Sequence, residues 1–223
     1  MFKALWKKKF VIITLALLVA FLPMAMTKEA TVLGKTIVTA IGIDKQNDEY
    51  AVFIESMIFN FDPFGVPERE LTSATAPTID AALEEIGMNM GRKISFSHCS
   101  IILLGSGLVD EDLVELLFPF LKKPQLSNGA VMMYTDDDVE EVMRISEETG
   151  DVRSAKLQQI AAFNKNRTNQ RIATTLEEFF RNSKGRDGRA RLSVIEIEDE
   201  ALVNSDRVVE LEFGIVTNSN GGD

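Results

Sequence analysis

An apolar stretch from Phe10 to Met26 follows directly on a cluster of lysines at positions 3, 7, 8 and 9, and this N-terminal segment restricts everything after it. Lysines before an apolar run stay on the cytoplasmic side of a membrane while the residues after the run cross. Residues 1–27 are therefore predicted to be a signal peptide or an N-terminal membrane anchor. Everything from Thr27 onward is predicted to lie on the extracytoplasmic face.

The sequence leaves both cleavage and retention of this segment open. As a helix the apolar stretch would reach about 26 Å, slightly short of a hydrocarbon core of about 30 Å. Pro23 interrupts the run near its end, and the best cleavage site, Ala25-Met26-Thr27, departs from the small-x-small pattern. No cysteine lies directly after the apolar run. Attachment through a lipidated N-terminal cysteine is therefore excluded.

The chain is acidic, with 24 basic against 34 acidic residues, and four of the basic residues belong to the N-terminal segment. A nucleic-acid-binding protein presents a basic face. Here the basic residues are scattered, apart from Lys184, Arg186, Arg189 and Arg191 in one loop, which we interpret as a solvated loop. No nucleic acid is predicted as a partner.

Strand and helix patterns alternate along the rest of the chain after an initial hairpin. Strands are predicted at 35–43, 49–59, 93–104, 130–135, 192–197 and 207–217. Helices are predicted at 79–91, from 110–112 to a kink or stop at Pro119, at 136–145, 151–169 and 174–182, with caps at Thr78, Gly91 and a Thr174-x-x-Glu177 capping box. Residues 60–77 are predicted to form a loop.

These patterns predict an α+β (mixed α/β) fold, in which a mixed sheet begun by an N-terminal hairpin has helices packed on it. We expect an N-terminal α/β domain over residues 28–190. Residues 191–223 are expected to be the start of a second domain or a C-terminal tail. Cys99 is the only cysteine, so no disulfide framework exists and stability must come from a packed core.

The search for catalytic chemistry begins at the adjacent residues His98 and Cys99, which could suggest a nucleophile and its base. On a continuous strand, however, neighbours point to opposite faces and cannot pair. His98 is therefore expected to be a structural, hydrogen-bonded residue at the edge of the core, and Cys99 a small buried apolar residue. A hydrolase using Cys99 or His98 stays the weakest of the hypotheses.

Metal and phosphate sites are weakly supported. Asp136, Asp137 and Asp138 lack the alternating spacing of a calcium loop and are better explained as helix caps. One histidine and one cysteine are too few ligands for a zinc site. The sequence Gly87-x3-Gly91-Arg92-Lys93 lacks the spacing of a phosphate loop and ends a helix. We predict no catalytic, cofactor-binding or metal-binding residues, no cofactor and no enzymatic activity.

Several segments follow one another in a characteristic order. The first strand, 35–44, is followed by the segment Ile94 to Leu104, in which a histidine precedes an aliphatic run. Next come the basic turn Lys122-Lys123-Pro124, the segment 175–180 and the loop 185–188. In this order the segments resemble the Ger(x)C family, the C subunits of bacterial spore germinant receptors, with 175–180 and 185–188 similar to the end of that family's first domain. The similarity spans residues 35–197.

The resemblance implies an outward-facing, membrane-anchored subunit of a spore germinant receptor that acts in spore germination through protein-protein contacts. Its expected partners are integral-membrane receptor subunits, and its expected location is the spore inner membrane. Family members begin their mature chain with a lipidated cysteine, whereas this chain would use its N-terminal apolar segment. The alternative is an extracytoplasmic solute-binding or sensory module associated with a transporter.

Overall fold

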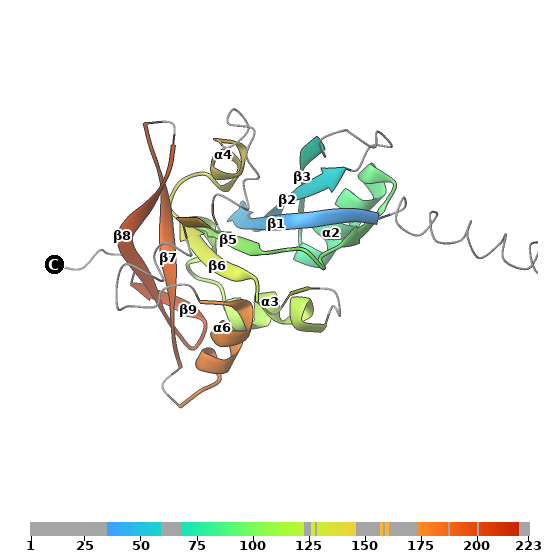
Figure 1. Ribbon diagram of the computed structural model, residues 1–223. Helices are drawn as coiled ribbons and strands as arrows, with labels where there is room; N and C mark the ends of the chain where they lie inside the picture. Colours follow the sequence, from blue (N-terminus) through green and yellow to red (C-terminus); the bar gives the residue numbers. More distant parts are fainter. Residues whose placement is uncertain are drawn as a thin grey trace, which may run out of the picture. The chain divides into compact units, whose positions relative to one another are not determined.

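The computed structural model describes residues 35–58, 68–122, 126–127, 129–145, 157, 159–160, 174–186, 188–199 and 201–218. In this part of the chain the strands form a nine-stranded mixed sheet with helices packed on it (Figure 1). The α+β class predicted from the sequence is confirmed. The sheet begins with the expected hairpin, in which β1 and β2 pair antiparallel.

The strands are β1 (Lys35–Gln46), β2 (Glu49–Ile58), β3 (Glu68–Ala76), β4 (Lys93–Ser95), β5 (Ile101–Gly105), β6 (Val131–Thr135), β7 (Arg189–Glu198), β8 (Ala201–Glu212) and β9 (Ile215–Asn218). The described helices are α2 (Ile79–Met90), the 3-10 helix η1 (Ser106–Leu108), α3 (Leu113–Lys122), α4 (Val139–Arg144) and α6 (Leu176–Ser183). Across the sheet the order is β3-β2-β1-β5-β6-β7-β8-β9, and β4 pairs with β1.

The centre of the sheet is parallel and both of its ends are antiparallel. Strands β1, β5, β6 and β7 run in one direction, as is usual for strands whose two faces are both covered. All five residues of β5 are buried, which explains its unbroken apolar sequence. The antiparallel partners β2 and β3 extend one end of the sheet, and β8 and β9 extend the other.

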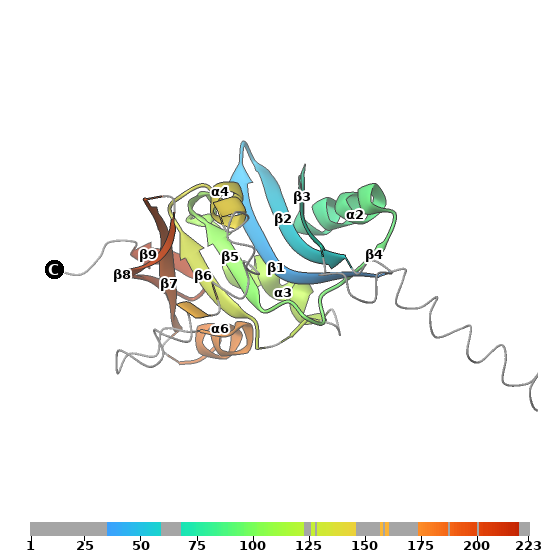
Figure 2. The same cartoon turned by 45° about the horizontal axis from the view of Figure 1, so that its top comes forward.

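Each face of the sheet carries its own hydrophobic cluster. The larger cluster packs α2, α3 and α6 against one face, and the smaller packs α4 and Leu157 against the other. Figure 1 shows α4 above the central strands with α3 and α6 below them, and Figure 2 shows α2 beside β3. Both faces of the central strands are therefore covered by apolar side chains.

Helix α4 lies close to the sheet because two strands carry glycine beneath it. A Cβ atom at Gly42 of β1 would lie 2.6 Å from Val139 Cγ1, and one at Gly105 of β5 would lie 2.7 Å from Val139 Cγ2. Asp138 caps α4, since its side chain accepts from the Glu141 amide at 2.9 Å. The capping role predicted for the aspartate run is thus confirmed for Asp138.

The predicted caps of α2 are confirmed, and the capping box of α6 is displaced by one residue. Thr78 accepts from the Ala81 amide, and Gly91 ends α2 in the left-handed region at φ 59°. The box of α6 is formed by Thr175 and Glu178 instead of Thr174 and Glu177. Thr174 instead donates its hydroxyl to the Arg191 carbonyl, so it ties the start of α6 to β7.

Three other sequence-based boundaries are wrong. Residues 68–76, predicted as loop, form strand β3, because small and polar residues pair with β2 through backbone hydrogen bonds that no hydrophobic pattern signals. The predicted strand 207–217 is a hairpin that turns at Phe213-Gly214 between β8 and β9. Helix α3 continues past Pro119 to Lys122, so of the predicted kink or stop at this residue only the stop is wrong.

Two sequence-based assignments stay untested. Strands β7, β8 and β9 belong to the same sheet as β6, yet the division of the chain into domains at residue 190 stays a prediction. The apolar segment 10–26 and most of the predicted helix 151–169 lie outside the described residues. In the part that is described, no helix is both long and apolar enough to cross a membrane.

Candidate functional site

Cys99 is buried in the larger hydrophobic cluster, as the sequence predicted. Its thiol contacts the Ile101 carbonyl oxygen at 3.4 Å, and burial raises the pKa of the thiol to about 12. A thiol with so high a pKa is protonated at neutral pH, whereas the nucleophile in cysteine chemistry is the thiolate. The environment of Cys99 is therefore that of a core residue.

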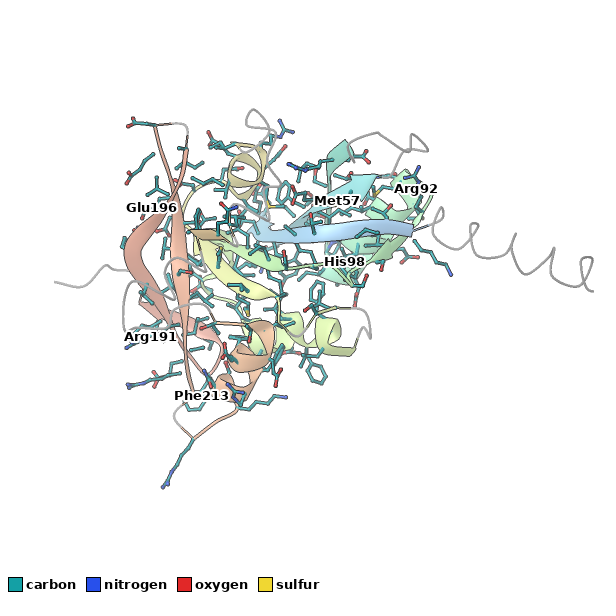
Figure 3. The ribbon with its side chains drawn as sticks, viewed as in Figure 1. Met57, Arg92, His98, Arg191, Glu196 and Phe213 are labelled. Atoms are coloured by element: carbon teal, nitrogen blue, oxygen red, sulfur yellow. The ribbon has the colours of Figure 1, made fainter. Side chains whose placement is uncertain are left out.

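The structural role predicted for His98 is wrong. The segment 93–104 is not one strand, because the chain turns at Ser97 and His98 between β4 and β5. His98 is exposed in this turn (Figure 3), so it is not an edge-of-core residue. His98 and Cys99 therefore do not lie on opposite faces of one strand. The Cys99 thiol is buried, however, and so it is still out of reach of a base on the surface.

The three consecutive aspartates divide among three structural roles. Besides the cap made by Asp138, Asp137 accepts a hydrogen bond from the Ile197 amide of β7 at 2.7 Å. Asp136 forms an ion pair with Arg207 of β8 at 2.7 Å, and Arg207 also contacts Glu196 at 2.8 Å. These contacts join the end of β6 to the antiparallel end of the sheet. Among the described residues, no group of three or more acidic, histidine or cysteine residues could hold a metal ion.

A second polar network joins the β1–β2 turn to the start of α3. Lys45 Nζ lies 2.6 Å from Glu111 Oε1, and the Tyr50 hydroxyl donates to Glu111 Oε2 at 2.8 Å. The hydrogen bond from Lys45 is the main cause that lowers the pKa of Glu111, followed by that from Tyr50. Nearby, Asp44 Oδ1 accepts from the amides of Lys45 and Gly107. All of these polar groups satisfy one another within the fold.

An acidic pocket of about 450 Å³ opens beside this network, between the first turns of α2 and α3. Its lining mixes carboxylates with apolar and aromatic groups: Tyr50, Pro77, Thr78, Ile79, Asp80, Glu111, Asp112, Glu115, Leu116 and Pro119. The partners of Glu111 and Asp112 lie within the fold. Glu111 contacts Lys45 and Tyr50, and Asp112 caps α3 by accepting from the amides of Val114 and Glu115.

A basic surface lies at the far end of α6. We use this name for Arg181, Lys184, Arg186 and Arg189 together with the aromatic rings of Phe118 and Phe213. Arg181, Arg186 and Arg189 line one open pocket of about 730 Å³, with Asn182, Gly185 and Glu212. Lys184 Nζ lies 5.1 Å from the centre of the Phe118 ring. The Phe213 ring packs over Gly188, where an added Cβ would lie 2.5 Å from it.

The sequence showed only part of this basic surface. Lys184, Arg186 and Arg189 were visible as one loop, whereas Arg191 on β7 pairs with Glu210 at 2.7 Å and lines a separate pocket together with Arg189. Phe118 and Phe213 come from α3 and the β8–β9 turn, and no local pattern connects them with the loop. The buried Glu55, which accepts from the Thr39 hydroxyl at 2.7 Å, was also missed, although a carboxylate within an apolar strand was a usable signal.

A comparison with known protein families matches the greater part of the chain. Residues 35–197 match the family model described as the spore germination protein N-terminal domain. The matched range runs from β1 into β7 and therefore includes most residues of both hydrophobic clusters. Searches of curated proteins and of solved structures gave no match.

Proposed function

Because the chain belongs to the family of the spore germination protein N-terminal domain, we propose that it is a non-enzymatic subunit of a spore germinant receptor, held on the outer face of the spore inner membrane. The observation that carries this proposal is the family match over residues 35–197. Membership supports a role in spore germination as a receptor C subunit. We further propose that the apolar segment 10–26 anchors the chain in the membrane and that the chain acts through protein-protein contacts.

The chemistry of the described residues supports action by contact. The Cys99 thiol is buried with a raised pKa, and His98 lies in an exposed turn. The carboxylates of the Lys45–Glu111 and Arg207–Asp136 networks are engaged in pairs that hold strands and helices together. Integral-membrane receptor subunits are the partners we propose.

Affinity purification from membranes of sporulating cells tests this function. The full chain carries a C-terminal tag, and the proteins recovered with it are identified by mass spectrometry. We expect multi-spanning membrane proteins to be recovered with the tagged chain. Recovery of the chain without any membrane protein, or from the soluble fraction alone, would contradict the proposal. A His98→Ala/Cys99→Ala variant with normal germination would remove the hydrolase hypothesis.

The acidic pocket favours a second candidate function, the binding of a small solute. Its volume of about 450 Å³ is within the range of small-molecule sites, roughly 300–1,000 Å³, and four of its ten lining residues are carboxylates. Carboxylates would select a cationic solute. A screen of small amines against the full chain in detergent tests this candidate, since a ligand of the folded state raises the melting temperature. Equal shifts in a Glu115→Gln variant would place any binding outside this pocket.

A further inference from the structure

We propose that the basic surface is a docking site for an anionic lipid membrane, with Phe213 as its apolar anchor and the arginines around it as the headgroup contacts. The inference deepens the proposed function and rests on it, because it requires the domain to be held near a membrane. It commits to an anionic lipid surface as the occupant.

The first step is the conformation of Phe213. This residue and Gly214 are the two central residues of the β8–β9 hairpin turn, and both have positive φ, at 51° and 91°. Such turns favour asparagine, aspartate or glycine, and a bulky residue in this region is strained. The Phe213 ring is nevertheless 58% exposed, and Ile215 beside it is 46% exposed. Neither the strained backbone at Phe213 nor its exposed ring is expected to increase the free energy of unfolding.

The second step is the rigidity of this turn. The Leu113 amide at the start of α3 donates to the Gly214 carbonyl at 3.0 Å, and the Phe213 amide donates to the Gly188 carbonyl at 2.7 Å. A Cβ atom at Gly214 would lie 2.6 Å from Val114 Cγ2, so the turn is packed closely against α3. The exposed ring is thus presented from a fixed backbone, so little backbone conformational entropy is lost when it binds.

The third step is local charge. Residues 181–191 contain five basic residues and one acidic residue, in a chain with a formal net charge of −10. Arg191 and Arg181 have carboxylates nearby, at 2.7 Å and 3.9 Å, whereas Arg186 and Arg189 form no ion pair with another described residue. Cationic side chains around exposed aromatic rings are typical of surfaces that bind anionic lipids.

A membrane fits this surface better than a protein partner does. The energetic centre of a protein interface is usually an aromatic or arginine anchor in a desolvated pocket. The open pocket at the basic surface has charged and polar walls and glycine, with no apolar side chain to enclose such an anchor. A lipid surface needs no enclosing pocket, because the ring enters the headgroup region while the arginines contact phosphates.

The test places one tryptophan at the proposed anchor of the full chain. Trp6 is the only native tryptophan, so Trp6→Phe removes it and Phe213→Trp supplies the reporter. The protein is added from outside to preformed vesicles of phosphatidylcholine, alone or mixed with phosphatidylglycerol, whose brominated acyl chains quench tryptophan on contact. Met88→Trp in the same Trp6→Phe background is the matched control, because Met88 is 68% exposed on α2, away from the basic surface.

We expect the tryptophan at position 213 to be quenched in the anionic vesicles, with much less quenching in neutral vesicles or at position 88. Arg186→Gln with Arg189→Gln should lower the equilibrium constant for binding to anionic vesicles on the order of 30-fold, given the typical effect of two cations at a membrane surface. The charge-matched control is Arg92→Gln with Lys93→Gln, exposed residues beside Gly91 (Figure 3), which should leave the quenching at position 213 unchanged.

Four results would overturn the inference: quenching at position 213 that is absent, no greater than at position 88, equal in both vesicle types, or insensitive to the arginine pair. If Phe213→Trp lowers the melting temperature, Ile215→Trp on β9 replaces it as the reporter, and the same outcomes decide. If the chain is recovered with membrane subunits but the tryptophan at position 213 is not quenched in anionic vesicles, the proposed function stands and this docking site is ruled out.

Discussion

The β1–β2 and β8–β9 hairpin turns share one backbone geometry and differ in their chemistry. In the first turn, Asn47 and Asp48 have positive φ, at 51° and 64°, and in the second Phe213 and Gly214 do, at 51° and 91°. Asparagine and aspartate suit this geometry, whereas phenylalanine does not. Both turns also contact the start of α3, the first through Lys45 and Glu111 and the second through Gly214 and Leu113.

This difference in side chains indicates which of the two turns has a purely structural role. Around the first turn, Lys45, Tyr50 and Glu111 satisfy one another, so its polar groups are engaged in internal contacts. Around the second, the Phe213 ring and the arginines of the basic surface face solvent. Residues kept against the preference of the backbone often mark functional sites. Stability should therefore depend on both turn backbones and on the Lys45–Tyr50–Glu111 network beside the first turn, but not on the Phe213 side chain.

The largest effect should come from Gly214→Ala. The new Cβ would lie 2.6 Å from Val114 Cγ2 at a φ of 91°, and such overpacking typically lowers the free energy of unfolding by about 1–3 kcal/mol. Asp48→Gly, at the matching position of the first turn, is the control. Its change should stay within about 0.5 kcal/mol, because the Asp48 side chain is fully exposed. Both variants are measured by denaturant unfolding. If they lose the same free energy of unfolding, the two turns do not differ in how closely they pack against the fold.

Asn47→Phe should have the next largest effect. It imitates the second turn at the first, and placing a bulky side chain at positive φ should lower the free energy of unfolding by about 1 kcal/mol. Asn47→Gly keeps the geometry without that penalty and serves as the control. If denaturant unfolding shows Asn47→Phe to be as stable as the native chain, phenylalanine is not strained at such a position, and our interpretation of Phe213 fails.

Glu111→Gln should change the pH dependence of stability by a smaller amount. Hydrogen bonds from Lys45 and Tyr50 lower the pKa of Glu111 in the folded state, so the folded chain holds this proton less tightly than the unfolded chain. The resulting stability is present above the carboxylate's ordinary pKa, about 4.3, and is lost as the pH falls through the lowered value. Melting temperatures between pH 7 and pH 3 should therefore fall less steeply for Glu111→Gln.

The smallest effect on stability should come from Arg186→Gln combined with Arg189→Gln. Both side chains are exposed and have no ion pair within the described residues, so the free energy of unfolding should change by less than about 0.5 kcal/mol. Arg207→Gln offers a contrast, because Arg207 bridges Asp136 and Glu196. A greater loss for the arginine pair than for Arg207→Gln would show that the basic surface is structural.

The fold was predictable from the sequence where side-chain patterns decide it. Long apolar runs identified β1, β2 and β6, and capping residues located α2 and α4. Strand β3 could not be found this way, because its small residues are held by backbone pairing at the edge of β2. The division of 93–104 into two strands was also hidden, since Ser97 is only a weak turn signal and the segment contains no Gly, Pro, Asn or Asp.

The candidate surfaces were less predictable than the strands, because tertiary contacts assemble them. The loop with Arg186 and Arg189 was recognisable as basic, yet α6 supplies Arg181, and the β8–β9 turn supplies Phe213. The Phe213-Gly214 turn itself lay inside a run predicted as one strand. Gly214 was a usable signal of a turn, but it stands inside an apolar run and follows Phe213, which is not one of the usual turn formers.

The unfolding midpoint of the full chain with Phe213→Asn tests the central claim most directly, namely that this side chain serves contact and not the fold. Asparagine tolerates positive φ and removes an exposed apolar ring, so the midpoint in detergent should equal or exceed that of the native chain. A midpoint clearly below the native value would show that the Phe213 ring holds the turn in place as a core residue, and would contradict the account.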